Sequence, residues 1–314
     1  MACSIAILGP TAVGKSWLGM ELATRLDGEI VSADALQAYC GFDIGTAKPS
    51  HAEQRRVPHH LIDILDPEKS FSAGEFSRLA LIAVEEIFGR HRQPLVIGGS
   101  GLYLRALLQG ISPIPPTSPE IRQELRARLE LEGLDALRQE LLELDATTAG
   151  RLGSGDTQRI VRALEVVLST GRPLSAWLSD DPEGQGPLQA VRLGLTLPRT
   201  VLYDRIAQRV RRMIEAGWVE EVQDLLNRGT SPEFRPFQAI GYRQLAEHVA
   251  GKISLEDALT ATVRATCRYA KRQMTWFRKE PAIRWFSMEN PEGCHQAVMR
   301  YLAEKGIGGG NGET

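Results

Sequence analysis

Short apolar runs alternate with longer amphipathic stretches through most of the chain. The runs have the length of buried strands, whereas the stretches between them repeat their apolar residues with the period of a helix. Because strands that are apolar along their whole length are covered on both faces, the alternation predicts an α/β protein with a largely parallel sheet. The predicted strands are Ser4–Leu8, Glu29–Ser32, Leu61–Leu65, Leu95–Ile97, Val191–Leu197 and Ile283–Phe286.

The middle of the chain has helical periodicity only. Between the Pro-rich Pro113–Pro116 and the Gly/Pro/Asp-rich Asp180–Pro187, no strand is predicted, and Ser118 stands as a cap before a first-turn proline. This pattern predicts an all-helical insertion in an α/β core, followed by a disordered Gly-rich tail. The predicted helices are Glu120–Leu131, Leu134–Leu144 and Thr157–Ser169, and the predicted parts are the core (1–112 and 188–305), the insertion (113–187) and the tail (306–314).

A complete G-x-x-x-x-G-K-[ST] motif follows the first predicted strand, and a helix is predicted after it over Lys15–Leu26. In such a loop the glycines let backbone N–H groups converge on phosphate oxygens, the lysine supplies a cation, and the hydroxyl can hold Mg²⁺. Strand, loop and helix occur in the required order. The sequence therefore predicts a phosphate-binding loop of Gly9, Pro10, Thr11, Ala12, Val13, Gly14, Lys15 and Ser16.

Two other predicted strands end in residues suited to a site. Asp34 follows the second strand, and Gly98-Gly99-Ser100-Gly101 follows the strand Leu95–Ile97. A nucleotide hydrolase of the P-loop class usually ends such a strand in Asp, to organise Mg²⁺ and water. Glycines and a hydroxyl allow close approach of a ligand without repelling phosphate. The better carboxylate candidate is therefore Asp34.

Composition describes an ordinary globular protein of 314 residues, 43% hydrophobic and 24% charged, with a formal net charge of −2. That charge neither supports nor excludes RNA binding. No apolar run reaches the ~18 residues of a membrane span, and no basic leader precedes the first strand. We expect a cytoplasmic protein with reduced thiols, because no C-x-x-C pair occurs among Cys3, Cys40, Cys267 and Cys294.

A local basic surface is predicted near the C-terminus. Arg264, Arg268 and Arg272 recur every four residues and so lie on one helix face, which is typical of an RNA-backbone footprint. Trp276 and Phe277 are interpreted as core residues rather than base stackers. The other cations of this stretch are Lys271, Arg278, Lys279 and Arg284.

Eight segments follow one another in order along the chain: 9–16, Ser32–Gln37, Gly41–Pro49, Val57–Asp63, Gly98–Tyr103, Asp156–Arg162, Ile240–Gln244 and Lys271–Arg278. In order and spacing they together resemble one family, the tRNA dimethylallyltransferases, also called tRNA isopentenyltransferases. The resemblance implies transfer of the dimethylallyl group from dimethylallyl diphosphate to N6 of the adenine at tRNA position 37, with release of diphosphate. The phosphate loop would then be a leaving-group site, with Mg²⁺ as cofactor and a monomer as the working unit.

The resemblance implies catalytic roles for Lys15, Asp34 and Ser100. Asp34 would accept the N6 proton; the alternatives are a Mg²⁺ organiser or a partner of the following turn. The Ser100 hydroxyl would contact the target nucleotide or the diphosphate, and the alternative is an N-cap for Leu102–Leu108. The family commonly has Ser where this chain has Ala35, and often Met where it has Leu36. Only a backbone contact is expected at Ala35.

The resemblance also implies the tRNA-binding residues. The Gln37 amide could read an adenine edge, and Gln158 and Arg162 share a helix face suited to phosphates and bases of the loop. Arg122 could equally be a plain solvated charge. Arg159 and Arg162 could also be surface charges, but their clustering after Gly153–Gly155 favours a function. The expected tRNA-binding set is Asp34, Ala35, Leu36, Gln37, Ser100, Arg122, Gln158, Arg159, Ile160, Val161, Arg162, Ala239, Ile240, Gly241, Tyr242, Arg243, Gln244, Lys271, Arg272, Gln273 and Arg278.

Two other classes of function compete with this interpretation. A P-loop small-molecule or nucleotide kinase would also show an α/β core with a helical insertion, but it has no use for the segments Gly98–Tyr103 and Gln158–Arg162 or for a basic stripe. A non-enzymatic RNA-binding module would leave a complete phosphate loop beside Asp34 idle. Release of diphosphate from dimethylallyl diphosphate with tRNA, against formation of ADP from ATP, separates the two enzymes.

Overall fold

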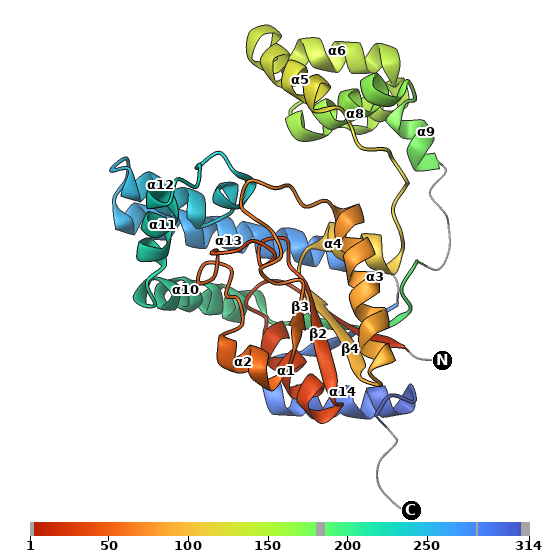
Figure 1. Cartoon of the computed structure of the whole chain (residues 1–314), viewed down its shortest axis with the longest axis vertical. Helices are drawn as coiled ribbons and strands as arrows, with labels where there is room; N and C mark the ends of the chain where they lie inside the picture. The colour runs from red at the N-terminus through yellow and green to blue at the C-terminus, as the bar shows by residue number, and fades with distance from the viewer. Residues whose placement is uncertain (1–2, 180–185, 281, 309–314) are drawn as a thin grey trace, which may run out of the picture. The chain divides into compact units, whose positions relative to one another are not determined.

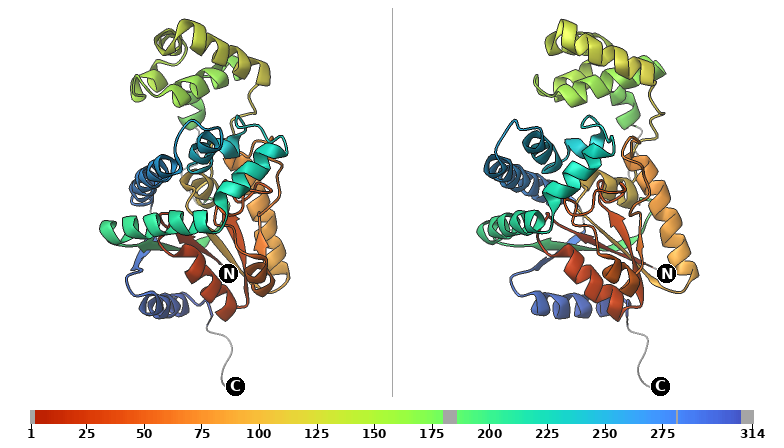
Figure 2. Two further views of the ribbon diagram at one scale, coloured as in Figure 1. Left: turned by 90° about the vertical axis from the view of Figure 1, so that its left-hand side faces the viewer. Right: turned by 60° about the vertical axis from the view of Figure 1, so that its left-hand side comes forward.

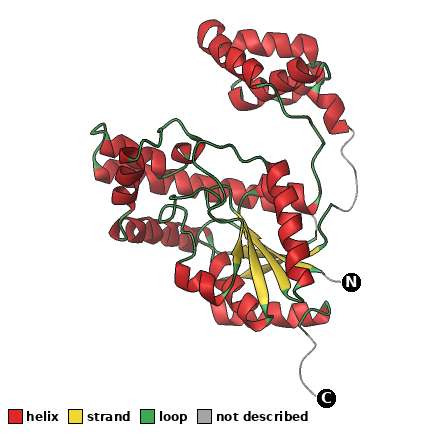
Figure 3. Cartoon of the chain, viewed as in Figure 1, coloured by secondary structure: helices red, strands yellow, loops and turns green. Residues whose placement is uncertain are grey.

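Six parallel strands form one sheet in the computed structural model, which describes residues 3–179, 186–280 and 282–308. They are β1 (Ser4–Leu8), β2 (Gly28–Ala33), β3 (His59–His60), β4 (Gln93–Gly98), β5 (Ala190–Thr196) and β6 (Ile283–Ser287). Their order is β3-β2-β4-β1-β5-β6, so β1 is an interior strand. Figures 1 and 3 show the sheet with helices packed around it. Ala6 of β1 pairs with Val96 on one side and with Arg192 on the other. The predicted parallel α/β fold is confirmed.

The predicted strand Leu61–Leu65 is wrong. Pairing stops at His60, because Leu61 and Asp63 have φ angles of 63° and 55°, in the left-handed region that an extended strand does not use. Leu65 forms only an isolated parallel bridge with Tyr39. The apolar alternation of this segment reflects a turn that packs against the chain after β2, and alternation alone does not reveal a left-handed backbone.

Helices cover both faces of the sheet. The odd-numbered residues Ile5 and Ile7 of β1 are buried in one core cluster with Leu18 and Leu22 of the first helix. Side chains alternate along a strand, so Leu8 faces the other side, where it lies beside Leu104. The helices next to the sheet are α1 (Lys15–Arg25), α2 (His51–Arg56), α3 (Ala73–Gly89), α4 (Gly101–Leu108) and α14 (Pro291–Glu304).

A second group of helices packs in series beside the sheet, α10 against α11 and α13, and α12 against α11 and α13 (Figure 2). These helices are α10 (Arg199–Glu215), α11 (Trp218–Asn227), the short 3₁₀ helix η1 (Arg235–Gln238), α12 (Tyr242–Val249) and α13 (Leu255–Phe277). Ser254 caps the start of α13, because its hydroxyl accepts a hydrogen bond from the N–H of Asp257.

The chain divides into two compact units, one of Met1–Gln109 with Gln185–Thr314 and one of Gly110–Gly184. The sequence predicts the insertion at 113–187, three residues later at each end. Helices are the only regular secondary structure among the described residues of the second unit, and Leu125, Leu141 and Leu164 lie in its core. Its helices are α5 (Pro119–Glu132), α6 (Leu134–Leu144), α7 (Ala146–Arg151), α8 (Thr157–Thr170) and α9 (Leu174–Ser179).

The start of the predicted disordered tail needs correction. Ile307 is only 8% exposed and lies in the main core cluster, so burial of this one apolar side chain extends the ordered fold past α14. Residues 309–314 of the predicted tail lie outside the described residues. All four cysteines are free thiols, as expected. No helix among the described residues is long and apolar enough to span a membrane.

Candidate active site

The carboxyl ends of β1, β2 and β4 bring the predicted catalytic residues to one edge of the sheet. Leu8, Ala33 and Gly98 are paired in register, so the residues that follow them leave the sheet side by side. They are the phosphate loop, Asp34 and Ser100 respectively. Ligands of open α/β sheets bind at this carboxyl edge. The sequence placed these groups on separate strands, and the strand register places them together.

The phosphate loop folds tightly over the end of β1. Gly9 has a φ of 150°, and a Cβ there would lie 2.8 Å from the Leu195 carbonyl oxygen, so only glycine fits without a shift. Lys15 Nζ donates hydrogen bonds to the carbonyl oxygens of Gly9 at 2.9 Å and Pro10 at 2.8 Å. An ammonium has three hydrogens, so one remains for a ligand.

Lys15 shares its surroundings with two further charged groups. Burial and the nearby Arg209 lower the pKa of Lys15 to about 7, although Asp34 acts in the opposite direction. Burial also lowers the pKa of the Arg209 guanidinium on α10, and Asp34 again opposes the shift. Arg209 is thus a candidate site residue that the sequence analysis missed. In the sequence, the neighbouring Arg211 and Arg212 suggest that Arg209 is one of several exposed arginines on a basic helix. Only the packing of α10 shows that the Arg209 side chain is half-buried.

Asp34 is half-buried, and its Oδ1 accepts a hydrogen bond from the N–H of Leu36 at 2.9 Å. This is the turn contact that was one of the alternative readings of Asp34. A carboxylate has two oxygens with about four acceptor sites, so the bond leaves Oδ2 able to accept a proton. The contact therefore orients the carboxylate and does not occupy it.

Ser100 stands at the N-cap position of α4, but its hydroxyl makes no capping hydrogen bond. Instead Oγ accepts a hydrogen bond from the N–H of Ala35, at 3.3 Å, next to Asp34. Burial and Asp34 raise the pKa of the adjacent Tyr269 to about 12, while hydrogen bonds to Gln273 and Ser100 act in the opposite direction. Ser100 thus faces the Asp34 turn, and the alternative of a plain helix cap is wrong.

The tRNA-binding residues expected on the α12 and α13 segments divide into exposed and buried groups. Tyr242 is fully buried and its hydroxyl donates to Glu221 at 2.6 Å, whereas Gln244 caps the N–H of Gly241. Gln273 is 6% exposed. These buried side chains can support a tRNA-binding surface, but they are not exposed for contact with tRNA themselves. The exposed members are Arg243, Lys271, Arg272 and Arg278, and Ala239 and Ile240 are half-buried.

The predicted stripe is on the surface. Arg264, Arg268 and Arg272 are all exposed on α13, and Phe277 is buried, as expected of a core residue. A hollow of about 400 Å³ opens beside the stripe. It is lined by Arg268, Lys271, Arg272, Thr275, Trp276 and Lys279.

In the helical unit, the expected tRNA contacts have internal partners. Arg122 Nε and Arg162 Nη1 each lie 3.1 Å from the buried carboxylate of Glu165, and both guanidiniums donate to the hydroxyl of Thr117. Ile160 is fully buried in the core of the unit, so its side chain is not available to a partner. Gln158 and Arg159 are exposed, and Val161 is half-buried.

The residues present suit a magnesium ion only in company with a phosphate ligand. Ser16 is exposed at the start of α1, but no group of three His, Cys, Asp or Glu side chains among the described residues could hold a metal. Mg²⁺ commonly binds through one or two protein oxygens together with substrate phosphates. One hydroxyl beside a phosphate loop fits that mode.

Comparisons with known proteins agree with this geometry. The IPP transferase family model matches residues 37–280. A tRNA dimethylallyltransferase of Trichlorobacter lovleyi is 44% identical over 300 residues, which cover 95% of this chain and 98% of that protein. The crystal structure of a full-length tRNA isopentenylpyrophosphate transferase from Bacillus halodurans has a TM-score of 0.70 and 38% identity, with 98% of each chain covered.

A eukaryotic dimethylallyltransferase that acts on tRNA has a TM-score of 0.81 and 26% identity, with 96% of this chain and 78% of that chain covered. The fold and site define a P-loop α/β protein with a helical insertion. The chain belongs to the IPP transferase family. This membership favours prenyl transfer over the kinase and the non-enzymatic RNA-binding module.

Proposed function

We propose that the chain transfers the dimethylallyl group of dimethylallyl diphosphate to N6 of adenine 37 in tRNA. One observation carries the proposal: the phosphate loop, Asp34 and Ser100 emerge from register-paired strand ends in a member of the IPP transferase family. The first group binds a diphosphate, and the other two flank the place where a nucleophile would approach.

The leaving group would be held by the phosphate loop, with its backbone N–H groups directed at the diphosphate. Lys15 and Arg209 add two cations where negative charge develops as the C–O bond breaks. The Ser16 hydroxyl would hold Mg²⁺ together with the phosphates. When bound, the ion would neutralise part of the charge that the diphosphate gains.

The nucleophile would be the exocyclic amine of the adenine. N6 attacks the allylic carbon, the bond from that carbon to the diphosphate oxygen breaks, and the N6 proton passes to Asp34 Oδ2. The Leu36 N–H fixes the carboxylate through Oδ1, which leaves the other oxygen as the acceptor. The Ser100 hydroxyl, held by Ala35, would orient the target nucleotide or the diphosphate.

tRNA would bind through exposed cations, while the target base is extruded from the anticodon loop. The stripe of Arg264, Arg268 and Arg272 offers phosphate contacts, and Arg243 adds one on α12. Gln37 would contact the base. Because the substrate would be tRNA, we propose that the enzyme acts in the cytoplasm. We also propose a monomer, because one chain carries every group that the reaction uses.

The test is the modification state of tRNA. Nucleosides from cells with and without this gene are separated and weighed by mass spectrometry. We expect N6-dimethylallyladenosine only in cells that have the gene, and expect it to return with the wild-type gene but not with a Lys15→Ala variant. Identical nucleoside profiles in the two strains would contradict the proposal.

A further inference from the structure

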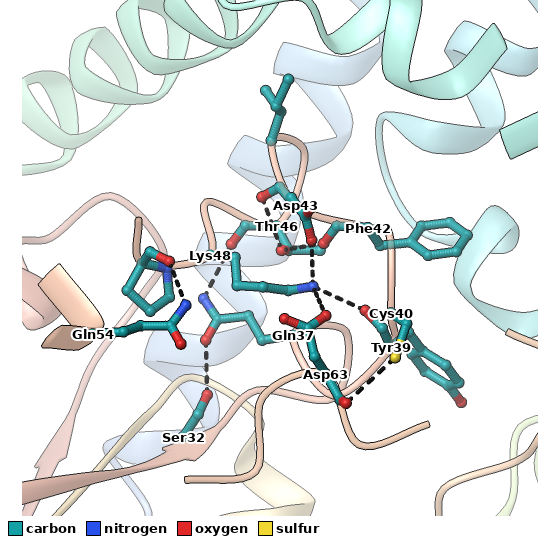
Figure 4. Close-up of polar contacts among 12 residues, drawn as sticks. Ser32, Gln37, Tyr39, Cys40, Phe42, Asp43, Thr46, Lys48, Gln54 and Asp63 are labelled. Atoms are coloured by element: carbon teal, nitrogen blue, oxygen red, sulfur yellow. Dashed lines mark hydrogen bonds and ion pairs between the residues drawn. The ribbon is translucent and has the colours of Figure 1, made fainter. Parts of the chain in front are cut away.

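The ammonium of Lys48 is buried between two carboxylates that reach solvent. The Lys48 side chain is 3% exposed, against 58% for Asp43 and 42% for Asp63. Nζ donates to Asp43 Oδ1 and Asp63 Oδ1, each at 2.5 Å, and to the Tyr39 carbonyl oxygen at 2.9 Å (Figure 4). These three bonds use all three hydrogens of the ammonium. Lys48 therefore ties the loop between β2 and α2, which carries Tyr39 and Asp43, to Asp63 after β3, and it has no donor left for a ligand.

The Lys48 contacts surround the side chain of Gln37. Gln37 Oε1 accepts from the Ser32 hydroxyl at 2.8 Å, and Nε2 donates to the carbonyl oxygen of Thr46 at 3.2 Å (Figure 4). Nε2 also donates to the carbonyl oxygen of Ala47 at 3.3 Å. Both carbonyls immediately precede Lys48 in the chain. Two carbonyl acceptors fix which end of the amide is nitrogen, so the orientation of Gln37 depends on where Lys48 holds this loop.

Asp63 contacts both Lys48 and Gln37. Its side chain binds Lys48, and its backbone N–H donates to the backbone carbonyl oxygen of Gln37 at 3.1 Å. Asp63 and Ala47 have φ angles of 55° and 49°. Left-handed backbone is unfavourable for side-chain-bearing residues, and it persists where the surrounding contacts hold it. Lys48 supplies such contacts for both residues, because it follows Ala47 in the chain and pairs with the side chain of Asp63.

We propose that Lys48 is a positioning residue that makes Gln37 specific for adenine, an inference that rests on the proposed function. Both amide hydrogens of Gln37 are bound to carbonyls and Oε1 already accepts from Ser32, so the capacity that remains is the second acceptor site of Oε1. An acceptor suits the N6 amine of adenine and disfavours the C6 oxygen of hypoxanthine or guanine, which is itself an acceptor. By holding the loop that carries Thr46 and Ala47, Lys48 would keep both amide hydrogens of Gln37 occupied. Gln37 could then only accept a hydrogen bond from the base.

The experiment compares Lys48→Met with Lys69→Met, a matched change at an exposed lysine that pairs with Asp66 on the surface. Two anticodon stem-loop RNAs are used, one with adenosine and one with inosine at the target position. We expect the wild type and Lys69→Met to bind the adenosine RNA more tightly by about 5-fold, the value of one hydrogen bond. In Lys48→Met this ratio should fall towards one. Its kcat/KM for the adenosine RNA should drop by about 100-fold, as misplacement of a site group does.

A second variant keeps the test sharp if Lys48→Met does not fold. Asp63→Asn retains the shape, and Asn tolerates left-handed backbone, so it removes the charge without new strain. It should lower the adenosine-to-inosine ratio, with the KM for dimethylallyl diphosphate within about 2-fold of wild type because the phosphate loop is untouched. An unchanged ratio in a folded Asp63→Asn protein would overturn the inference. Failure of the wild type to modify the adenosine RNA would instead overturn the proposed function.

Discussion

Gln273 on α13 accepts a hydrogen bond from the backbone N–H of Thr11 in the phosphate loop, at 2.9 Å. Its Nε2 donates to the Gly99 carbonyl oxygen at 2.8 Å, at the end of β4. Since α13 also carries the exposed stripe of arginines, one buried amide connects the cationic helix to two of the three strand ends of the site.

Replacing this amide should loosen the phosphate loop. Gln273→Leu keeps the volume but leaves the Thr11 N–H and the Gly99 carbonyl unpaired, at a cost of about 1–3 kcal/mol. We expect a lower melting temperature and a raised KM for dimethylallyl diphosphate. Gln223→Leu, at an exposed position of α11, is the control. Equal stability and KM in the two variants would show that the Gln273 contacts do not hold the loop.

The pKa of Lys15 predicts a pH dependence of donor binding. In the enzyme without bound donor, the Lys15 ammonium has a pKa of about 7, so it loses its proton around that pH. A bound diphosphate favours the ammonium, so the complex holds more protons than the free enzyme above that pH. The KM for dimethylallyl diphosphate should therefore rise by up to about tenfold per pH unit above about pH 7. Calorimetry in buffers of different ionisation enthalpy should show proton uptake on binding.

The same measurement on Lys15→Met is the control for this titration, because the variant has no ammonium to lose. It should bind the donor weakly at every pH, without proton uptake. A wild-type KM that stays constant from roughly pH 6.5 to 9 would contradict the assignment of Lys15 as the titrating group.

Asp34→Asn should separate proton transfer from binding. The amide keeps the shape and the Oδ1 bond to the Leu36 N–H, but it is a poor proton acceptor. We expect kcat to fall by about 100-fold or more, with the KM for the donor little changed. Asp27→Asn, just before the amino end of β2, should remain active. Near-normal turnover in Asp34→Asn would reduce Asp34 to an orienting role.

The stripe of α13 should bind tRNA by its phosphates. Neutralising Arg264, Arg268 and Arg272 should weaken all tRNAs about equally and make the slope of log K against log salt shallower by up to ~2–3 units. Turnover at saturating tRNA should persist. The control neutralises three exposed arginines elsewhere, Arg25, Arg55 and Arg78. If the slope of log K against log salt is unchanged in the stripe variant, the stripe does not bind tRNA phosphates, and the phosphate contacts must come from exposed cations of other segments.

How far the sequence reaches is clear from particular elements. The order of strand, loop and helix at Gly9–Ser16 is a local pattern, and five of the six predicted strands overlap observed ones. Arg209 could not be predicted, because its meaning comes from the packing of α10 beside Lys15 and Asp34. Nor could the sequence distinguish an exposed Arg243 from a buried Gln273, since both stand in matching segments and only the tertiary fold separates them.

The central claim is tested most directly by the stoichiometry of the purified enzyme with tRNA and dimethylallyl diphosphate. Released diphosphate and N6-dimethylallyladenosine are counted in the same reaction over time. The account predicts one diphosphate for each modified adenine, and none without tRNA. Diphosphate release without tRNA modification, or ADP formed from ATP in place of either product, would contradict it.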